Sequence, residues 1–146
     1  MKLSTKSRYG LRLMLQLAIN YSKGTLSLGD ISKKEDISEK YLSQLVIPLK
    51  ARGFIRSIRG SAGGYILGKV PSEITVKDIV EVFEGDLMPL ECINNSSSCN
   101  RTNFCATRKI WTLLGNKISE VLNSLTLKDL VEMDGKSKED FLDYMI

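Results

Sequence analysis

The segment from Phe54 to Leu67 constrains the fold most strongly, because it predicts a β-hairpin at a fixed place in the chain. Its two arms, Phe54–Ile58 and Tyr65–Leu67, are rich in the apolar and aromatic residues that strands favour. Between them lies RGSAGG, Arg59 to Gly64, a basic and glycine-rich tip whose glycines allow a tight turn. The hairpin therefore marks the end of the structural unit that the residues before it form.

Three helices are predicted ahead of this hairpin, and they cover residues 7–21, 27–34 and 38–53. In the first helix, apolar residues recur at helical spacing: Leu11, Met14, Leu15, Ala18 and Ile19. Ser27 and Ser38 stand where a hydroxyl caps the free N–H groups of the second and third helices, and Asp30 completes a capping-box pattern with Ser27. The order of helix, short helix, helix and hairpin predicts a winged helix-turn-helix, a mainly α fold with a small β-hairpin wing.

The third helix is the one that a helix-turn-helix protein places in the major groove of DNA. Its inner face is predicted to consist of Tyr41, Leu42, Leu45 and Leu49. Pro48 lacks a backbone N–H, so we expect a kink late in the helix or an end near Ile47. Gly53 is expected to stop the helix in the left-handed conformation.

Positive charge is concentrated in the first half of the chain. Residues 1–70 hold 13 Lys and Arg against 4 Asp and Glu, whereas residues 71–146 hold 8 against 13. This asymmetry is typical of a polyanion-binding module joined to a second unit, and the alternatives are a chance imbalance on a solvated surface or a protein-binding adaptor. Double-stranded DNA is the predicted partner. The predicted contacts come from the first helix, the third helix and the wing: Ser4, Lys6, Ser38, Lys40, Tyr41, Ser43, Gln44, Arg59, Gly60 and Gly64.

The second half is predicted to contain helices on either side of a polar loop. Thr75 and Asp78 form a capping-box pattern for a helix that Gly85 ends, and Thr126 with Asp129 caps a short last helix. The predicted units are a DNA-binding domain (1–84), a cysteine loop (85–102), a long dimerisation helix with a short capping helix (103–132) and a flexible tail (133–146).

The long helix carries an apolar stripe that suits a second copy of the chain. Its members are Ile110, Leu113, Leu114, Ile118, Val121, Leu122 and Leu125. A homodimer is favoured because helix-turn-helix proteins commonly bind two half-sites, and the alternative is that the stripe closes the monomer core.

All three cysteines lie within fourteen positions, at Cys92, Cys99 and Cys105, in a chain without histidine. Thiolates are ligands for zinc and for iron–sulfur clusters. The spacing is wider than the short Cys-x-x-Cys spacings of zinc sites, so it favours a larger cluster, with zinc or unliganded redox-active thiols as alternatives. The polar residues between Cys92 and Cys99 predict a loop that orders only around a ligand.

At this point the chain resembles the Rrf-two family of winged-helix transcriptional regulators. The matching pieces are MKLSTKSRYGLRLML, DISKKEDISEKYLSQL and IRSIRGSAGGYILGK, and the resemblance extends over roughly residues 1–130. It implies a dimeric repressor with a [2Fe-2S] or [4Fe-4S] cluster on Cys92, Cys99 and Cys105. An IscR-like member would regulate cluster-assembly genes and receive its cluster from assembly proteins.

The sequence also departs from the patterns that the resemblance implies. An IscR-like chain has histidine where this chain has Arg108, and an NsrR-like chain, which senses nitric oxide, has aspartate where this chain has Arg8. Arginine is always protonated, so the fourth ligand is not identified. Ser43 also replaces a glutamate common in IscR-like proteins. A CymR-like branch, which answers to cysteine supply, lacks the three cysteines, and their presence argues against that branch.

Other function classes find little support. No nucleophile elbow or phosphate-binding loop exists, and RGSAGG joins two strands, so an enzyme is not expected. A membrane-spanning helix needs about 20 apolar residues, and Arg8 and Arg12 interrupt the N-terminal apolar stretch. A cytoplasmic protein without membrane contact is predicted.

Overall fold

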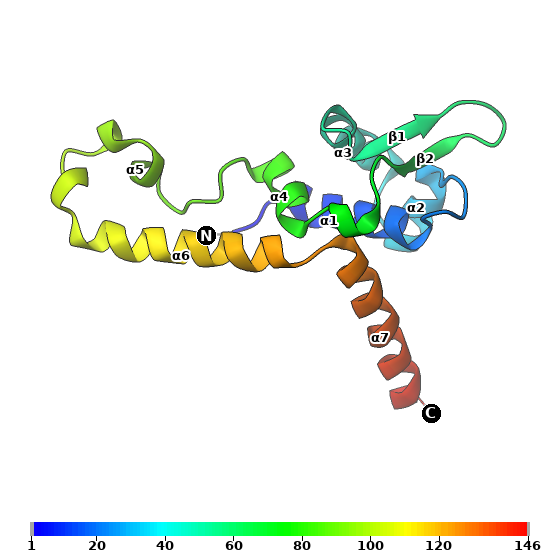
Figure 1. Ribbon diagram of the computed structural model, residues 1–146. Coiled ribbons are helices and arrows are strands. Elements are labelled where there is room, and N and C mark those ends of the chain that lie inside the picture. Colours follow the sequence, from blue (N-terminus) through cyan, green and yellow to red (C-terminus); the bar gives the residue numbers. More distant parts are fainter. Residues whose placement is uncertain (1, 146) are drawn as a thin grey trace.

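Three helices and a hairpin form the first part of the chain, in the predicted order. The computed structural model describes residues 2–145, and it shows a helical protein with one two-stranded sheet (Figure 1). The elements are α1 (Thr5–Ile19), α2 (Leu28–Glu35), α3 (Glu39–Ala51), β1 (Ile55–Ile58) and β2 (Gly64–Leu67). The strands are antiparallel, with Ile55 opposite Leu67 and Ile58 opposite Gly64. The predicted winged helix-turn-helix is confirmed.

The core of this part is formed by α1, α2 and α3 together with the hairpin. Leu13 and Met14 of α1 are fully buried, and Leu17 is nearly so. The face predicted for α1 was therefore partly wrong, because Leu11 and Leu15 are only half-buried. Residues 11–19 offer apolar side chains on nearly every side, so periodicity alone does not decide which of them face the other helices.

Helix α3 runs through Pro48 to Ala51, so the alternative of an end near Ile47 is wrong. Proline removes only one donor from the helix, and the buried side chains of Val46 and Leu49 hold both sides of it against the core. Regular bonding resumes beyond it, because the N–H of Arg52 donates to the Pro48 carbonyl at 3.2 Å. Gly53 follows with a φ of 78°, which confirms the predicted left-handed stop.

The second part of the chain contains four α-helices and three short 3₁₀ turns. They are η1 (Pro71–Glu73), α4 (Val76–Glu84), α5 (Glu91–Asn94), η2 (Ser96–Ser98), η3 (Thr102–Phe104), α6 (Ala106–Ser124) and α7 (Leu127–Met145). The predicted capping box at the start of α4 is present in both directions between Thr75 and Asp78. Ile74 and Ile79, on either side of that cap, are fully buried.

Helix α7 is much longer than the short capping helix that was predicted, and it covers most of the segment expected to be a flexible tail. Thr126 and Asp129 do cap it, with the Asp129 N–H donating to the Thr126 hydroxyl at 3.2 Å. No proline interrupts residues 127–145, the helix continues through Asp134-Gly135, and Lys138 pairs with Asp134 one turn earlier at 2.6 Å. The sparse apolar residues of this segment were mistaken for disorder.

The joint between α6 and α7 is fastened to the start of α4. The N–H of Val76 donates to the Leu125 carbonyl at 2.8 Å, and the N–H of Leu127 donates to the Ile74 carbonyl at 2.9 Å. Leu127 is fully buried in the core. From this joint, α6 extends away from the helix-turn-helix and carries the α5 segment at its far end, while α7 points in another direction (Figure 1). Across residues 2–145, none of the helices has the length and apolar character needed to cross a membrane.

Candidate nucleic-acid interface and cysteine segment

Helix α3 presents a polar row on the side opposite its buried face. Its buried residues are Leu42, Leu45, Val46 and Leu49. The exposed row consists of Lys40, the adjacent pair Ser43 and Gln44, and Ile47; the pair lies three and four residues from Lys40 and from Ile47, so all four share one side of the helix. Lys40, Ser43 and Gln44 were predicted as contact residues, whereas Ile47 was not. We call these four residues the α3 outer row.

The start of α3 is fixed by Ser38 and Tyr41. The Tyr41 N–H donates to the Ser38 hydroxyl at 3.2 Å, which is the predicted N-cap. The half-buried ring of Tyr41 meets the ring of Tyr9 on α1 edge to face, with centroids 5.8 Å apart. Because Lys6 is exposed one turn before Tyr9, this aromatic pair brings the basic start of α1 towards the start of α3.

A half-buried carboxylate holds α2 against α1. Glu35 at the end of α2 pairs with Arg12 at 2.7 Å and accepts from the Gln16 amide at 2.6 Å. The Arg12 guanidinium also lies 5.2 Å from the centroid of the Tyr9 ring. This network fixes the angle between the first two helices and therefore the position of α3.

The wing places Arg59 and Gly60 at its exposed tip, as predicted. Gly60 has a φ of 112°, which favours glycine. The Thr25 hydroxyl donates to the Ala62 carbonyl at 2.9 Å and so braces the tip from the loop before α2. Gly64 has a role inside the fold, because a Cβ there would lie 2.7 Å from the Leu26 carbonyl oxygen. Its contact with DNA stays a prediction.

The N-terminus of α1 is tied to the end of α4. Ser4 caps α1, and its own N–H donates to Glu84 at 2.6 Å. The buried hydroxyl of Ser7 donates to the same carboxylate oxygen at 2.5 Å. These hydrogen bonds, first from Ser7 and then from Ser4, lower the pKa of Glu84. The N–H and the hydroxyl oxygen of Ser4 therefore already bond within the protein. The predicted contact of Ser4 with DNA would use its remaining hydrogen-bonding capacity.

The three cysteines lie at separate points of the segment between α4 and α6. Cys92 lies in α5 and is half-buried, Cys99 is exposed between η2 and η3, and Cys105 caps α6. None of them forms a disulfide. Within residues 2–145, no three Cys, Asp or Glu side chains lie close enough together to hold a metal ion. The donor chemistry suits a cluster, and holding one would require the three thiols to move closer together than they lie here.

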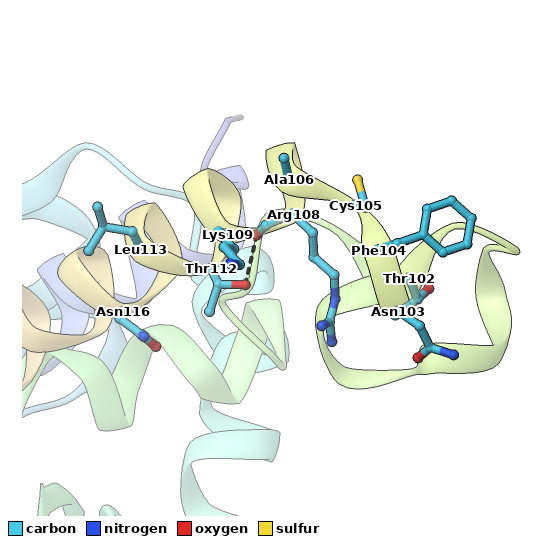
Figure 2. Close-up of a pocket in the computed structure, with 10 residues that line it drawn as sticks. All are labelled: Thr102, Asn103, Phe104, Cys105, Ala106, Arg108, Lys109, Thr112, Leu113 and Asn116. Carbon is cyan, nitrogen blue, oxygen red and sulfur yellow. Dashed lines mark hydrogen bonds between the residues drawn. The ribbon is translucent and has the colours of Figure 1, made fainter.

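The thiol of Cys105 has the surroundings of a reactive group. It lies 3.2 Å from the Thr107 hydroxyl. That contact, followed by the backbone N–H of Arg108 at the start of α6, lowers the pKa of Cys105. Figure 2 shows this sulfur at the edge of a pocket of about 590 Å³. The lining residues are Thr102, Asn103, Phe104, Cys105, Ala106, Arg108, Lys109, Thr112, Leu113 and Asn116.

Arg108 joins the two ends of the cysteine segment. Its guanidinium donates to the carbonyl of Cys92 at 3.1 Å and to the carbonyl of Ile93 at 3.0 Å. At the position where a fourth ligand was expected, the chain therefore has a side chain that fastens α5 to α6. In Figure 2 the guanidinium of Arg108 and the sulfur of Cys105 point in different directions.

A family model described as an iron-dependent transcriptional regulator matches residues 3–133, most of the chain. The chain belongs to the Rrf2 family. It is therefore a DNA-binding transcriptional regulator and not an enzyme, as the sequence predicted.

Individual Rrf2 relatives include two differently named regulators, CymR and IscR. CymR of Bacillus subtilis is 40% identical over 145 residues, which cover 99% of this chain and 100% of that protein. IscR of Pectobacterium atrosepticum is 36% identical over 131 residues, which cover 90% of this chain and 79% of that one. The expected IscR-like assignment is therefore not favoured over a CymR-like one.

Solved Rrf2 structures confirm the fold. The structure of CymR, described as the global cysteine regulator of B. subtilis, matches with a TM-score of 0.79 and 41% identity, over 91% of this chain and 98% of that one. IscR of T. potens matches with a TM-score of 0.78 and 36% identity, over 94% of this chain and 90% of that one.

Proposed function

We propose that this Rrf2 chain is a homodimeric repressor that reads operator DNA with the α3 outer row and the wing. The observation that carries the proposal is the α3 outer row itself, which is exposed on a helix whose other side is locked into the core. Gln44 suits an adenine edge, and Lys40 suits guanine or phosphate. Arg59 at the exposed wing tip suits a phosphate or the minor groove.

Dimerisation through α6 is the second part of the proposal. Only Gly115 is buried along the 19 residues of α6. The large apolar side chains that remain exposed on it are Ile110, Trp111, Leu113, Leu114 and Val121. An exposed apolar stripe of this length is typical of an interface, and a second copy of the same stripe would cover it around a two-fold axis.

The cysteine segment is the proposed control element. We propose that Cys92, Cys99 and Cys105 hold an iron–sulfur cluster, that cluster-assembly proteins supply it and that cluster-assembly genes are among the targets. A bound cluster would link three points of the segment and would be open to loss under oxidation. Two features of the chain would connect the segment to α6. The Arg108 side chain donates a hydrogen bond to the Cys92 carbonyl, and Cys105 is the N-cap residue of α6. A change in the segment would therefore reach the proposed dimer helix directly.

A second candidate is a regulator that responds to cysteine supply or thiol oxidation without a cluster. It is favoured by the end-to-end match to CymR and by the separation of the three thiols. The pKa of Cys105, lowered by Thr107 and the Arg108 N–H, would then favour the thiolate, which is the form that reacts.

Purification without oxygen separates the two candidates. The cluster proposal predicts visible absorption with stoichiometric iron and sulfide, and loss of both in Cys92→Ala, Cys99→Ala and Cys105→Ala, each still a folded dimer. Ser98→Ala is the matched control and should keep the cluster. A colourless protein that contains zinc or no metal would overturn the cluster proposal and leave the DNA-reading proposal standing.

A further inference from the structure

Ile47 is an apolar side chain in a place where folding does not need one. Its side chain is 70% exposed, which makes it the most exposed large apolar residue of residues 2–84. It lies in the α3 outer row between polar neighbours, on the side of the helix away from Leu45 and Leu49. An exposed isoleucine adds nothing to the core and has a lower helix propensity than the common surface residues.

The other members of the α3 outer row leave room for an apolar contact. The Ser43 hydroxyl donates to the Lys40 carbonyl at 2.7 Å, so its hydrogen is already used within the helix. Gln44 is therefore the one member with an uncharged donor and acceptor to offer, and Ile47 lies one turn after it. Side chains three apart on a helix are about 5–6 Å apart, while bases follow each other every 3.4 Å along a strand, so the two residues would reach neighbouring base pairs.

Only one base edge in the major groove offers an apolar group. Thymine carries a C5-methyl group, and apolar side chains recognise it by contact, whereas the amide of glutamine pairs with adenine. We propose that Ile47 is a specificity residue that packs on a thymine methyl group next to the base pair that Gln44 reads. The inference rests on the proposed DNA-reading role of α3 and adds the base that this helix selects.

Removal of single methyl groups from the DNA tests the contact. The operator is first selected from a pool of random duplexes, and each thymine of a half-site is then replaced by deoxyuridine. At fixed salt, fluorescence anisotropy should find one thymine per half-site whose replacement weakens binding about fourfold, and about fifteenfold when both half-sites are changed, as expected for the loss of one buried carbon.

Variants of Ile47 assign the effect to this side chain. Ile47→Ala should bind the parent operator more weakly and should no longer distinguish thymine from deoxyuridine at that position. Ile47→Val should keep the discrimination. Val70→Ala, which shortens another exposed apolar residue of the same part of the chain, should behave like the parent protein. Because Ile47 is exposed, all variants should keep the parent melting temperature.

Two results would overturn the inference. One is a half-site in which no thymine is sensitive to loss of its methyl group. The other is a methyl effect that stays the same in Ile47→Ala. If Gln44→Ala and Arg59→Ala still weaken binding in those cases, the DNA-reading role of α3 stands and only the Ile47 contact fails. If no duplex is selected at all, both fail together.

Discussion

The helix-turn-helix part differs from the arm that α5 and α6 form (residues 91–124) in how much of its apolar surface the chain itself covers. In the first part, α1, α3 and the hairpin bury a continuous core around Leu13, Leu42 and Ile55, each at most 1% exposed. In the arm, α6 buries only Gly115 and leaves most of its apolar residues in water. The first part, with Ile79 of α4 and Leu127 of α7 in its core, therefore covers its own apolar surface, whereas the arm leaves apolar surface that a second copy would cover. A change of conformation in the cysteine segment of the arm therefore need not unfold the helix-turn-helix part.

The largest expected effect is on stability, and it comes from the same leucine-to-alanine substitution made once in each region. Leu49→Ala removes a fully buried side chain and should lower the free energy of unfolding by about 3 kcal/mol. Leu113→Ala removes an exposed side chain of α6 and should change the stability of the helix-turn-helix part by less than about 0.5 kcal/mol. Urea denaturation followed by circular dichroism measures both, and equal losses at the two sites would break the contrast.

A charge on the α6 stripe tests whether a second copy covers it. Val121→Glu places carboxylates on the predicted two-fold interface and should raise the dimer dissociation constant about 100-fold or more. The monomer should stay folded, with a helical circular dichroism spectrum like that of the parent. Asn123→Glu adds the same charge away from the stripe and is the matched control. Analytical ultracentrifugation measures the effect, and two variants that dimerise equally would rule out this interface.

The smallest expected effect concerns Glu84, where the two regions join. Its pKa is lowered by hydrogen bonds from Ser7 and Ser4, so the ionised form stabilises the folded state. That contribution is present at neutral pH and is lost as the pH falls below the ordinary value of 4.5 and through the lowered pKa. Glu84→Gln should therefore cost about 1 kcal/mol at pH 7 and progressively less as the pH falls below 4.5.

The control for Glu84 is Glu132→Gln, which changes an exposed carboxylate on α7. Thermal unfolding at several pH values should show that the stability of Glu132→Gln differs little from that of the parent and that the difference does not change with pH. If Glu84→Gln cost the same at pH 3 as at pH 7, the hydrogen bonds to Ser4 and Ser7 would not depend on its charge. The join between α1 and α4 would then need another explanation.

Local chemistry made the helix starts predictable. Ser38 and the pair of Thr75 and Asp78 act within one turn, so a short stretch of sequence contains all the information that the cap needs. The buried face of α1 was harder, because the choice between Leu11 and Leu13 depends on which side meets α3 and α4. Pro48 was given too much weight, since one missing hydrogen bond is small beside the burial of its neighbours.

Long-range contacts set the limit of what the sequence could predict for the site. The bonds of Ser4 and Ser7 to Glu84 join residues about 80 positions apart. Ile47 was overlooked because an isoleucine in a helix is usually part of the core, and only its exposure shows otherwise. The cysteines were found at once from their clustering, yet their separation in space depends on how Arg108 fastens α5 to α6.

We propose that control of the DNA-reading part rests in the cysteine segment. The most direct test is the affinity of one dimer for one selected operator, measured by anisotropy without oxygen, before and after iron and sulfide are removed. We expect a change of about tenfold or more, within the usual range of coupling between two sites, and no such change in Cys105→Ala. Equal affinities of the loaded and stripped proteins would contradict it.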